Sequence, residues 1–176
     1  MSNFTDCIVR GGRVTVRMAN LMLTDVKPET FARQPRLASG LVKTNHPAFV
    51  FGHLATYPAA WLQAAGLPAR PECAVPAGWT DLFAAGKECH DDPDRKIYPA
   101  MPEIVAFFNQ SHESALGAMA SLSDAKLAEP NPREGRIREM FPTLGGMLMF
   151  YATCHMMMHV GQVSAWRRCF GLGSVM

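Results

Sequence analysis

The chain has 176 residues, the size of one domain, and 48% of them are hydrophobic, so it can bury a core and is not of the disordered class. Its 17 basic and 15 acidic side chains leave a net charge of +2, which excludes the basic surface of a nucleic-acid-binding protein and gives no attraction to an anionic membrane. Its five cysteines form no CxxC pair, so we expect no disulfide framework and a cytoplasmic protein.

Hydrophobic periodicity predicts four long amphipathic helices and no strand of useful length. In chain order these helices span about residues 3–24, 45–66, 102–122 and 142–169. Residues 67–99 are rich in Pro, Gly and charge and predict a long surface connection with one short helix. Together these features predict an all-α four-helix bundle with long crossover connections, formed by a single domain over residues 1–176.

Local signals refine three of these helices. The pair Gly11–Gly12 lowers helix propensity in the first helix and indicates a close approach of a neighbouring helix. Pro58 removes a backbone hydrogen bond inside the second helix and predicts a kink one turn after His53. The arginine pair at 167–168 lies in the last turn of the fourth helix, where it suits the negative end of the helix dipole.

Two histidines in the fourth helix are the strongest candidates for chemistry. His155 and His159 are four residues apart, so they share one helix face and could share a metal ion, with His53 as the best candidate for a third ligand. Such a pair arises by chance in many helices, but imidazoles without partners in an apolar helix cost free energy. The protease motif HExxH is excluded, because Met156 stands where its glutamate would be. Gln162, one turn further on, either orients a bound water or a ligand imidazole or is a helix-packing amide.

Other residues are weaker candidates. His112 lies beside the inner stripe of the third helix and is either a fourth ligand, a group supporting the ligands, or, more commonly, a satisfied half-buried histidine. Tyr57, on the apolar stripe of the second helix, is expected to support the ligands. His90 lies in the acidic run ECHDDPD, which has metal-ligand chemistry but favours a solvated loop, and Glu113 is a general base only if its helix turns inward.

Two motifs taken together resemble the DinB-like superfamily of metal-dependent helical bundles. The first is Gly-His-Leu at 52–54 in the second helix, and the second is HxxxHxGQ at 155–162 followed by the arginine pair. The resemblance covers about residues 40–171. The sequence departs from the commoner pattern of the family at Pro58 and in the ECHDDPD run, and neither departure removes a candidate metal ligand. Both could reshape the mouth of the pocket, so the substrate class is not transferred.

The resemblance implies a divalent metal ion, commonly zinc or nickel, bound by three histidines, here His53, His155 and His159. Family members with known activity are mostly thiol-dependent transferases or isomerases that use bacillithiol, mycothiol or glutathione. Others are described only as hydrolases, and many members are homodimers. We therefore expect a metalloenzyme that activates a thiol or water for reaction with a small molecule. The alternatives are a non-catalytic metal- or ligand-binding protein of a stress response, and a bundle with no metal.

Overall fold

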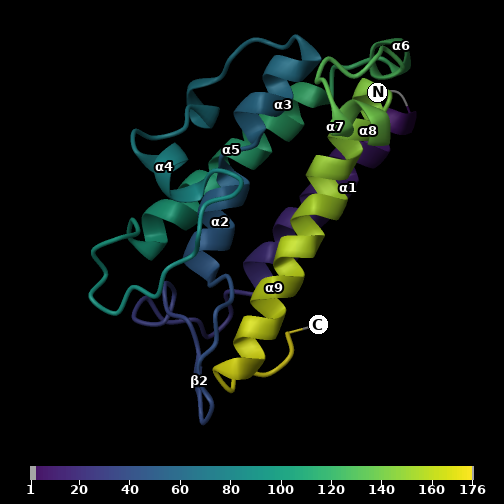
Figure 1. Ribbon diagram of the computed structural model, residues 1–176. Helices are drawn as coiled ribbons and strands as arrows, with labels where there is room; N and C mark the ends of the chain where they lie inside the picture. Colours follow the sequence, from purple (N-terminus) through teal and green to yellow (C-terminus); the bar gives the residue numbers. More distant parts are fainter. Residues whose placement is uncertain (1–2, 176) are drawn as a thin grey trace.

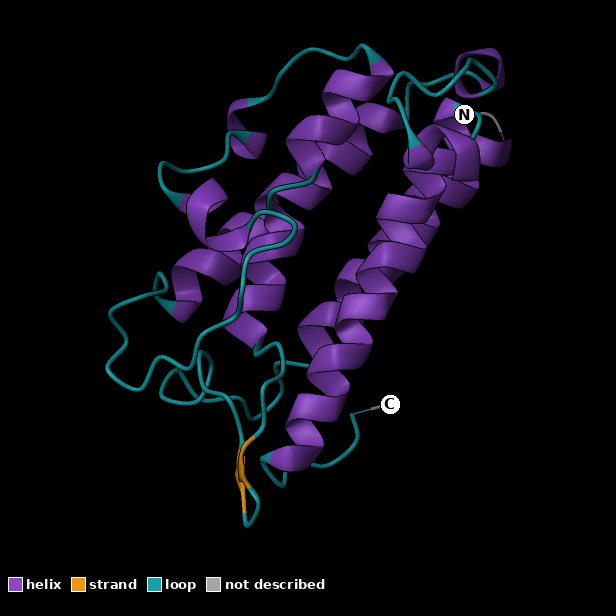
Figure 2. Ribbon diagram, in the orientation of Figure 1, coloured by secondary structure: helices purple, strands orange, loops and turns teal. Residues whose placement is uncertain are grey.

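The computed structural model describes residues 3–175, whose helices form a bundle (Figures 1 and 2). Its arms are, in chain order, α1 (Asn3–Leu21), α2 (Pro47–Ala55) with α3 (Pro58–Ala65), α5 (Met101–Met119), and α8 (Leu144–Met149) continued by the π-helix η2 (Phe150–His155) and by α9 (Met156–Cys169). Helix α5 contacts α1, α2 and α3, while α1 packs along η2 and α9. The predicted all-α four-helix bundle is confirmed. None of the helices in the described range is long and apolar enough to cross a membrane.

Three long connections join the arms, as predicted for a crossover bundle. Their elements are, in chain order, the antiparallel strands β1 (Arg36–Leu37) and β2 (Gly40–Leu41), the 3₁₀-helix η1 (Pro71–Cys73), α4 (Trp79–Phe83), α6 (Asp124–Leu127) and α7 (Arg136–Met140). The hairpin is too short to leave an alternating pattern in the sequence. Residues 79–86 are the part of the second connection that predicts a short helix; the helix begins at Trp79 as expected and ends earlier, at Phe83.

The second arm is interrupted rather than kinked. Helix α2 ends at Ala55 and α3 begins at Pro58, whose missing N–H suits the first turn of a new helix. The N–H of Tyr57 still bonds to the carbonyl oxygen of Leu54, at 3.3 Å. The interruption leaves Tyr57 at the junction, with its ring 5.0 Å from the ring of His53.

The connection between α3 and α5 is mostly exposed, as its composition predicts, but a few of its side chains anchor it in the core. Its apolar side chains Cys73, Trp79, Phe83 and Tyr98 are buried and belong to the main core. Burial of these side chains outweighs the polar character of the segment, because each removes apolar surface from water. The connection therefore forms part of the wall of the bundle beside α2.

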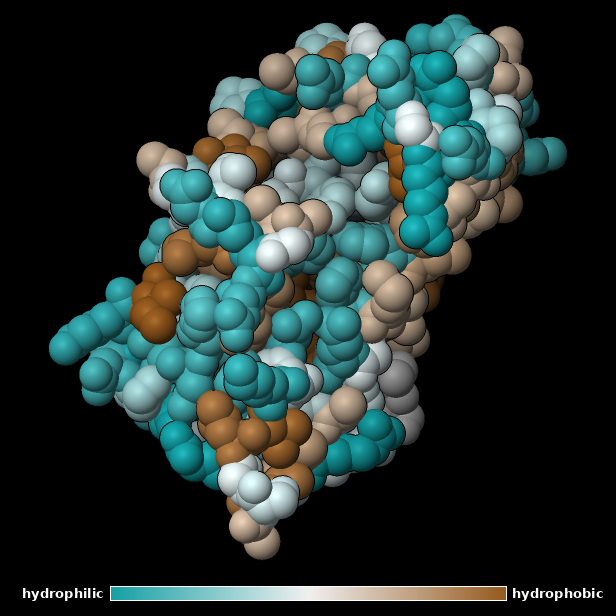
Figure 3. Space-filling view, viewed as in Figure 1, coloured by the Kyte–Doolittle hydropathy of each residue, from teal (hydrophilic) through white to brown (hydrophobic). Residues whose placement is uncertain are grey.

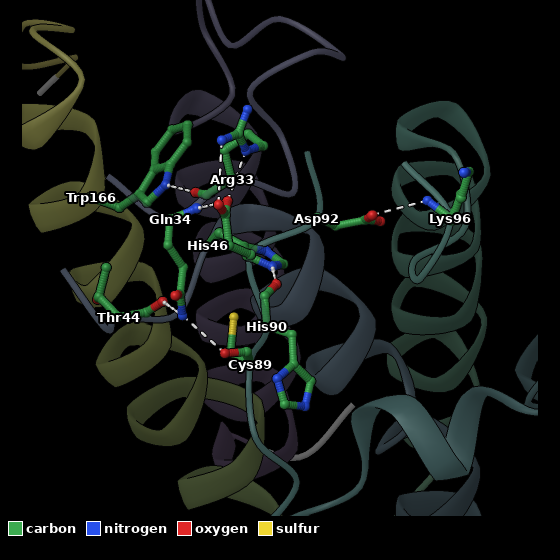
Figure 4. A network of polar contacts seen from close by, with 10 residues as sticks. Arg33, Gln34, Thr44, His46, Cys89, His90, Asp92, Lys96 and Trp166 are labelled. Atoms are coloured by element: carbon green, nitrogen blue, oxygen red, sulfur yellow. Dashed lines mark hydrogen bonds and ion pairs between the residues drawn. The ribbon is translucent and has the colours of Figure 1, made fainter. Parts of the chain in front are cut away.

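Hydrogen bonds hold the base of the bundle together, where the loops meet α9 (Figure 4). The guanidinium of Arg33 pairs with Asp91 at 2.7 Å, and the carbonyl oxygen of Arg33 accepts a hydrogen bond from Trp166 Nε1 at 2.7 Å. The side-chain amide of Gln34 donates to the carbonyl oxygens of Thr44 and Cys89. These contacts join segments that lie far apart in the chain.

The acidic run ECHDDPD is part of this network, and the prediction of a solvated loop is wrong for its central residues. Asp92 is only 2% exposed, and its carboxylate accepts hydrogen bonds from three consecutive backbone N–H groups at 96–98. The carbonyl oxygen of His90 accepts a hydrogen bond from Nε2 of His46 at 2.9 Å. Nδ1 of His46 in turn accepts a hydrogen bond from the N–H of Phe49. The carboxylate thus holds the loop in its own turn, and the buried imidazole ties the loop to the start of α2.

Two further sequence features are now explained. A Cβ atom on Gly12 would lie 2.6 Å from the side chain of Leu116, and one on Gly11 would lie 3.1 Å from Thr153, so the predicted close approach is confirmed on two sides of α1. Arg167 lies in the last turn of α9, as expected, but its side chain is buried rather than exposed at the helix end. It is 3% exposed and donates hydrogen bonds to the carbonyl oxygens of Met22, Thr24 and Gly173, which fastens α9 to the end of α1.

Candidate metal centre

Three histidines from two arms of the bundle meet in space. His53 lies on α2, His155 ends η2, and His159 lies one turn into α9. One ring nitrogen from each lies within 4.8 Å of those of the other two. The ring centroids are 4.7 Å apart for His155 and His159, 4.8 Å for His53 and His159, and 5.6 Å for His53 and His155. The arrangement brings together the three residues predicted from the sequence.

Helix α2 holds His53 through its neighbour Gly52. A Cβ atom on Gly52 would lie 2.4 Å from the ring of Phe83, so only glycine lets α4 approach α2 this closely. That approach carries the carbonyl oxygen of Phe83 to 2.7 Å from Nδ1 of His53. The hydrogen bond fixes the proton on Nδ1 and leaves Nε2 as the nitrogen available to a ligand.

The fourth arm positions the other two histidines with a local change of helix type. Residues Phe150–His155 form a π-helix, which continues into α9 without a break. Such segments are rare and occur frequently at functional sites. The sequence gives no direct signal for it, because the residues of the segment, FYATCH, are compatible with an ordinary α-helix. The wider turn places His155 at the boundary between the two helix types.

Gln162 supports His159. Its Oε1 lies 2.9 Å from Nδ1 of His159 and also accepts a hydrogen bond from Nδ2 of Asn45 at 3.0 Å. Because Asn45 donates to this oxygen, the amide is held with Oε1 toward the imidazole, and Nδ1 carries the proton. The tautomer of His159 is thereby the same as that of His53. Asn45 reads from the sequence as part of a helix cap, so its role here was not foreseen.

The three imidazoles are neutral near pH 7, the form that binds metal ions. Burial, together with the positive charges that His159 and His53 would carry, lowers the pKa of His155 to about 3. Burial also lowers the pKa of His53, against the opposing hydrogen bond to Phe83. It does the same for His159, against the hydrogen bond to Gln162.

A scan against family models matches residues 14–163 of this chain to the DinB superfamily. The chain belongs to the DinB superfamily. A search of the curated proteins found no match. The match spans all three histidines, so this DinB protein carries them inside the region that defines its family.

In this DinB protein the two motif glycines differ in their surroundings. Gly52 is required by the ring of Phe83, as described above. A Cβ atom on Gly161 would meet nothing within 4 Å. The first glycine therefore shapes the histidine cluster, whereas nothing within residues 3–175 explains the second.

Tyr57 lies at the cluster, where its hydroxyl group is 3.3 Å from Nε2 of His53. Its ring lies 4.8 Å from the ring of His155 and 5.3 Å from that of Tyr151. Burial raises the pKa of Tyr57, as does Tyr151, while the positive charge of Arg133 opposes them. The phenol is thus protonated at neutral pH and can donate a hydrogen bond toward the ligand side of the cluster.

The other sequence candidates lie elsewhere. His112 is fully buried, not half-buried, and its ring packs against Phe108 and Trp61. Its Nδ1 bonds to the carbonyl oxygen of Phe108, and its Nε2 has no hydrogen-bond partner in the described part of the chain. Glu113 is exposed and pairs with Arg13, so its helix does not turn inward at this residue. His112 is not among the histidines whose donor atoms converge.

Proposed function

We propose that this DinB protein binds a divalent metal ion, zinc or nickel, through His53, His155 and His159, and that it is a metalloenzyme. The observation that carries the proposal is the convergence of three neutral imidazoles, two of which have the second nitrogen already bonded. Within residues 3–175 no acidic or cysteine side chain joins the three. Three protein ligands with a remaining open position are typical of catalytic rather than structural zinc sites.

The residues fit such an ion. Nitrogens bonded at roughly 2.1 Å to one tetrahedral zinc ion are about 3.4 Å apart, so the present spacing of up to 4.8 Å closes when the rings turn inward by about an ångström. No carboxylate balances the cluster, so the rings would repel one another if protonated, and a cation is the complementary ligand. The hydrogen bonds of Phe83 and Gln162 restrict the rings to orientations that keep Nε2 on the shared side.

A bound divalent ion would lower the pKa of a thiol or a water molecule and so supply a nucleophile at neutral pH. The protein's own part is to orient the donors and to limit access. Gln162 and Asn45 hold His159, and the hydroxyl group of Tyr57 can donate a hydrogen bond to a small ligand beside His53. We favour a thiol S-transferase over a hydrolase, by analogy with the family alone. A non-catalytic metal-binding protein of a stress response is the alternative.

The test begins with metal content. Untagged protein is stripped with a chelator, reloaded with zinc or nickel, and analysed by mass spectrometry for bound metal. We expect one ion per chain in the wild type, a large loss in His53→Ala and His155→Ala, and no loss in the control His90→Ala, whose ring is exposed outside the cluster. Unchanged metal content in both cluster variants would refute the proposal.

The loaded protein is then assayed with several thiols and a chlorodinitrobenzene electrophile, and separately with ester substrates. Turnover that is lost in His155→Ala supports an enzyme and identifies its class. Full metal loading with no turnover of any substrate supports the non-catalytic alternative.

The proposal includes a homodimer formed through α1 and the rod made of α8, η2 and α9. Six of the ten exposed large apolar side chains lie on these adjacent elements: Phe4, Val14, Leu21, Met149, Met157 and Met158. Residues 141–166 contain no charged side chain, although many of them are exposed. Hydrophilic side chains cover most of the face shown in Figure 3, and apolar side chains lie scattered among them. Exposed apolar residues concentrated in this way mark interaction surfaces.

Light scattering after gel filtration tests the dimer. We expect a dimeric wild type that becomes monomeric in Met158→Glu, because the new charge would be buried in the contact. Met140→Glu is the matched control, since Met140 is 54% exposed and Met158 is 56% exposed, and Met140 lies on α7 outside this surface. A wild type that stays monomeric at all concentrations would refute this part of the proposal.

A further inference from the structure

A row of half-buried aromatic rings leads away from the histidine cluster. It consists of Tyr57, Tyr151, Phe150 and Phe141, which we call the aromatic strip. The centroid distances along it are 5.3 Å from Tyr57 to Tyr151, 5.2 Å from Tyr151 to Phe150, and 4.5 Å from Phe150 to Phe141. Every ring in the strip is partly exposed, whereas most of the other aromatic side chains in this protein are buried. The strip is therefore an accessible apolar surface in contact with His155.

The π-helix creates this arrangement. In an α-helix, residues five positions apart point in clearly different directions, but the i→i+5 hydrogen bonding of a π-helix brings them onto nearly the same side. Phe150 and His155, five positions apart at the two ends of η2, accordingly have ring centroids only 6.0 Å apart. Tyr151 lies 5.3 Å from the same imidazole. The local change of helix type thus places both rings beside a candidate metal ligand.

The strip lies on the side of the cluster that a ligand would occupy. Nδ1 of His53 is bonded to Phe83, so Nε2 is the nitrogen that faces the cluster, and the hydroxyl group of Tyr57 makes a long hydrogen bond to it at 3.3 Å. Tyr57 is also the first ring of the strip. A molecule that reaches the free nitrogens past Tyr57 consequently meets the rings of Tyr151 and Phe150 next. The only polar atoms that the strip contributes are the two phenol oxygens.

We propose that the aromatic strip is the binding site for a flat apolar group, such as a phenyl ring, on the small molecule that the three-histidine centre takes. This inference rests on the proposed metal-binding function and adds the class of ligand. Ring pairs in offset or edge-to-face contact contribute about 0.5–1.5 kcal/mol beyond the area that they bury. A ligand with a donor group at one end and a phenyl ring at the other would use the histidines and the strip together.

The test compares two metal-binding probes that differ mainly in this group, acetohydroxamate with a methyl group and benzohydroxamate with a phenyl group. Each is titrated into cobalt-loaded protein, and the visible absorption of the cobalt ion reports binding without any need for turnover. Their affinities for cobalt ion in water provide the reference. We expect the protein to favour benzohydroxamate by roughly tenfold more than this reference, as expected for aromatic stacking together with buried area.

The variant Phe150→Ala should reduce the preference for the phenyl probe to about twofold and leave the affinity for acetohydroxamate unchanged. Phe107→Ala is the matched control, because Phe107 is also half-buried but packs against Trp79 on another side of the bundle. It should keep the full preference, and circular dichroism confirms that both variants are folded.

Equal preference in protein and water would overturn the inference while leaving the metal site intact. So would a preference that survives both Phe150→Ala and Tyr151→Ala. Failure of the wild-type protein to bind cobalt would overturn the proposed function, and the inference with it.

Discussion

The histidines at the base of the bundle and those in the candidate metal centre differ in their hydrogen bonds. At the base of the bundle, His46 uses both ring nitrogens, one to the carbonyl oxygen of His90 and one to the N–H of Phe49. In the candidate metal centre, His53 and His159 use Nδ1 in the same way, but their other nitrogens converge with one from His155. The first arrangement is complete without a ligand. In the second, three nitrogens converge on one point, and the Tyr57 hydroxyl group beside Nε2 of His53, at 3.3 Å, is a partner that a ligand could replace.

The difference separates a structural role from a binding role more clearly than burial does. Burial lowers the pKa of both His46 and His155, to about 4 and about 3. What distinguishes them is the direction of the free nitrogen and the presence of two further imidazoles around the same point. A buried polar group that is fully hydrogen-bonded stabilises its surroundings, whereas converging donors with open positions are suited to a ligand.

Removing one histidine from each part is the most direct test of this difference between a binding role and a structural role. Zinc at about one hundred times its dissociation constant should add about 2.7 kcal/mol to the free energy of unfolding of the wild type. We expect His155→Ala to abolish this gain and His46→Ala to retain it. His46→Ala should itself lower the stability of the metal-free protein by about 2 kcal/mol, because the cap of α2 is lost and the carbonyl of His90 loses its partner. Denaturant unfolding with and without zinc measures both effects, and a zinc gain in His155→Ala would contradict the comparison.

Acid should weaken the scaffold of the metal-free protein. The pKa of both His46 and His112 is lowered to about 4 by burial, from an ordinary value near 6.5. Between these values the two imidazoles bind more protons in the unfolded chain than in the folded chain, so the stability that they contribute falls as the pH falls from about 6.5 to about 4 and then levels off. Each group contributes roughly 1.4 kcal/mol per pH unit within that window.

Melting temperatures measured from pH 7.5 to 4 should show this loss. The variant His112→Met should have a shallower slope than the wild type, because one of the buried titrating groups is gone. An identical slope would show that His112 does not contribute.

Substitutions of the two motif glycines test whether the packing of α4 against α2 controls the metal affinity of the histidine cluster. Gly52→Ala would force the ring of Phe83 to move, and with it the carbonyl that orients His53. Loss of such a supporting contact typically lowers metal affinity 10- to 100-fold. Gly161→Ala, in the other family motif, is the control, since a Cβ atom there meets open space. Competition with a zinc-binding dye measures the affinity, and equal affinity in both variants would refute the role of Gly52.

The smallest expected effect comes from the support of His159. Gln162→Leu keeps the approximate size of the side chain but removes the acceptor for Nδ1 of His159, so zinc affinity should fall about tenfold with little change in stability. Gln63→Leu, on the surface of α3, is the control. The same dye competition applies, and an unchanged affinity in Gln162→Leu would indicate that the amide only packs.

Local sequence patterns by themselves determine the helices of this protein and point to the three histidines of its candidate metal centre. Apolar stripes at helical spacing predict the four arms, and Gly11–Gly12 predicts a close helix contact that the structure confirms. The four-residue spacing of His155 and His159, with His53 on another apolar stripe, predicts that the three lie together. These features are readable because they depend on periodicity within single helices.

The tertiary structure alone decided the rest. Nothing in the sequence FYATCH distinguishes a π-helix from an α-helix. The π-helical conformation nevertheless is what places Phe150 and Tyr151 beside His155. The polar connection after α3 turns inward because its few apolar side chains find places in the core, and its carbonyl at Phe83 then sets the tautomer of His53. Such contacts join residues far apart in the chain, so their free energies depend on packing between elements and leave no periodic signal in the sequence.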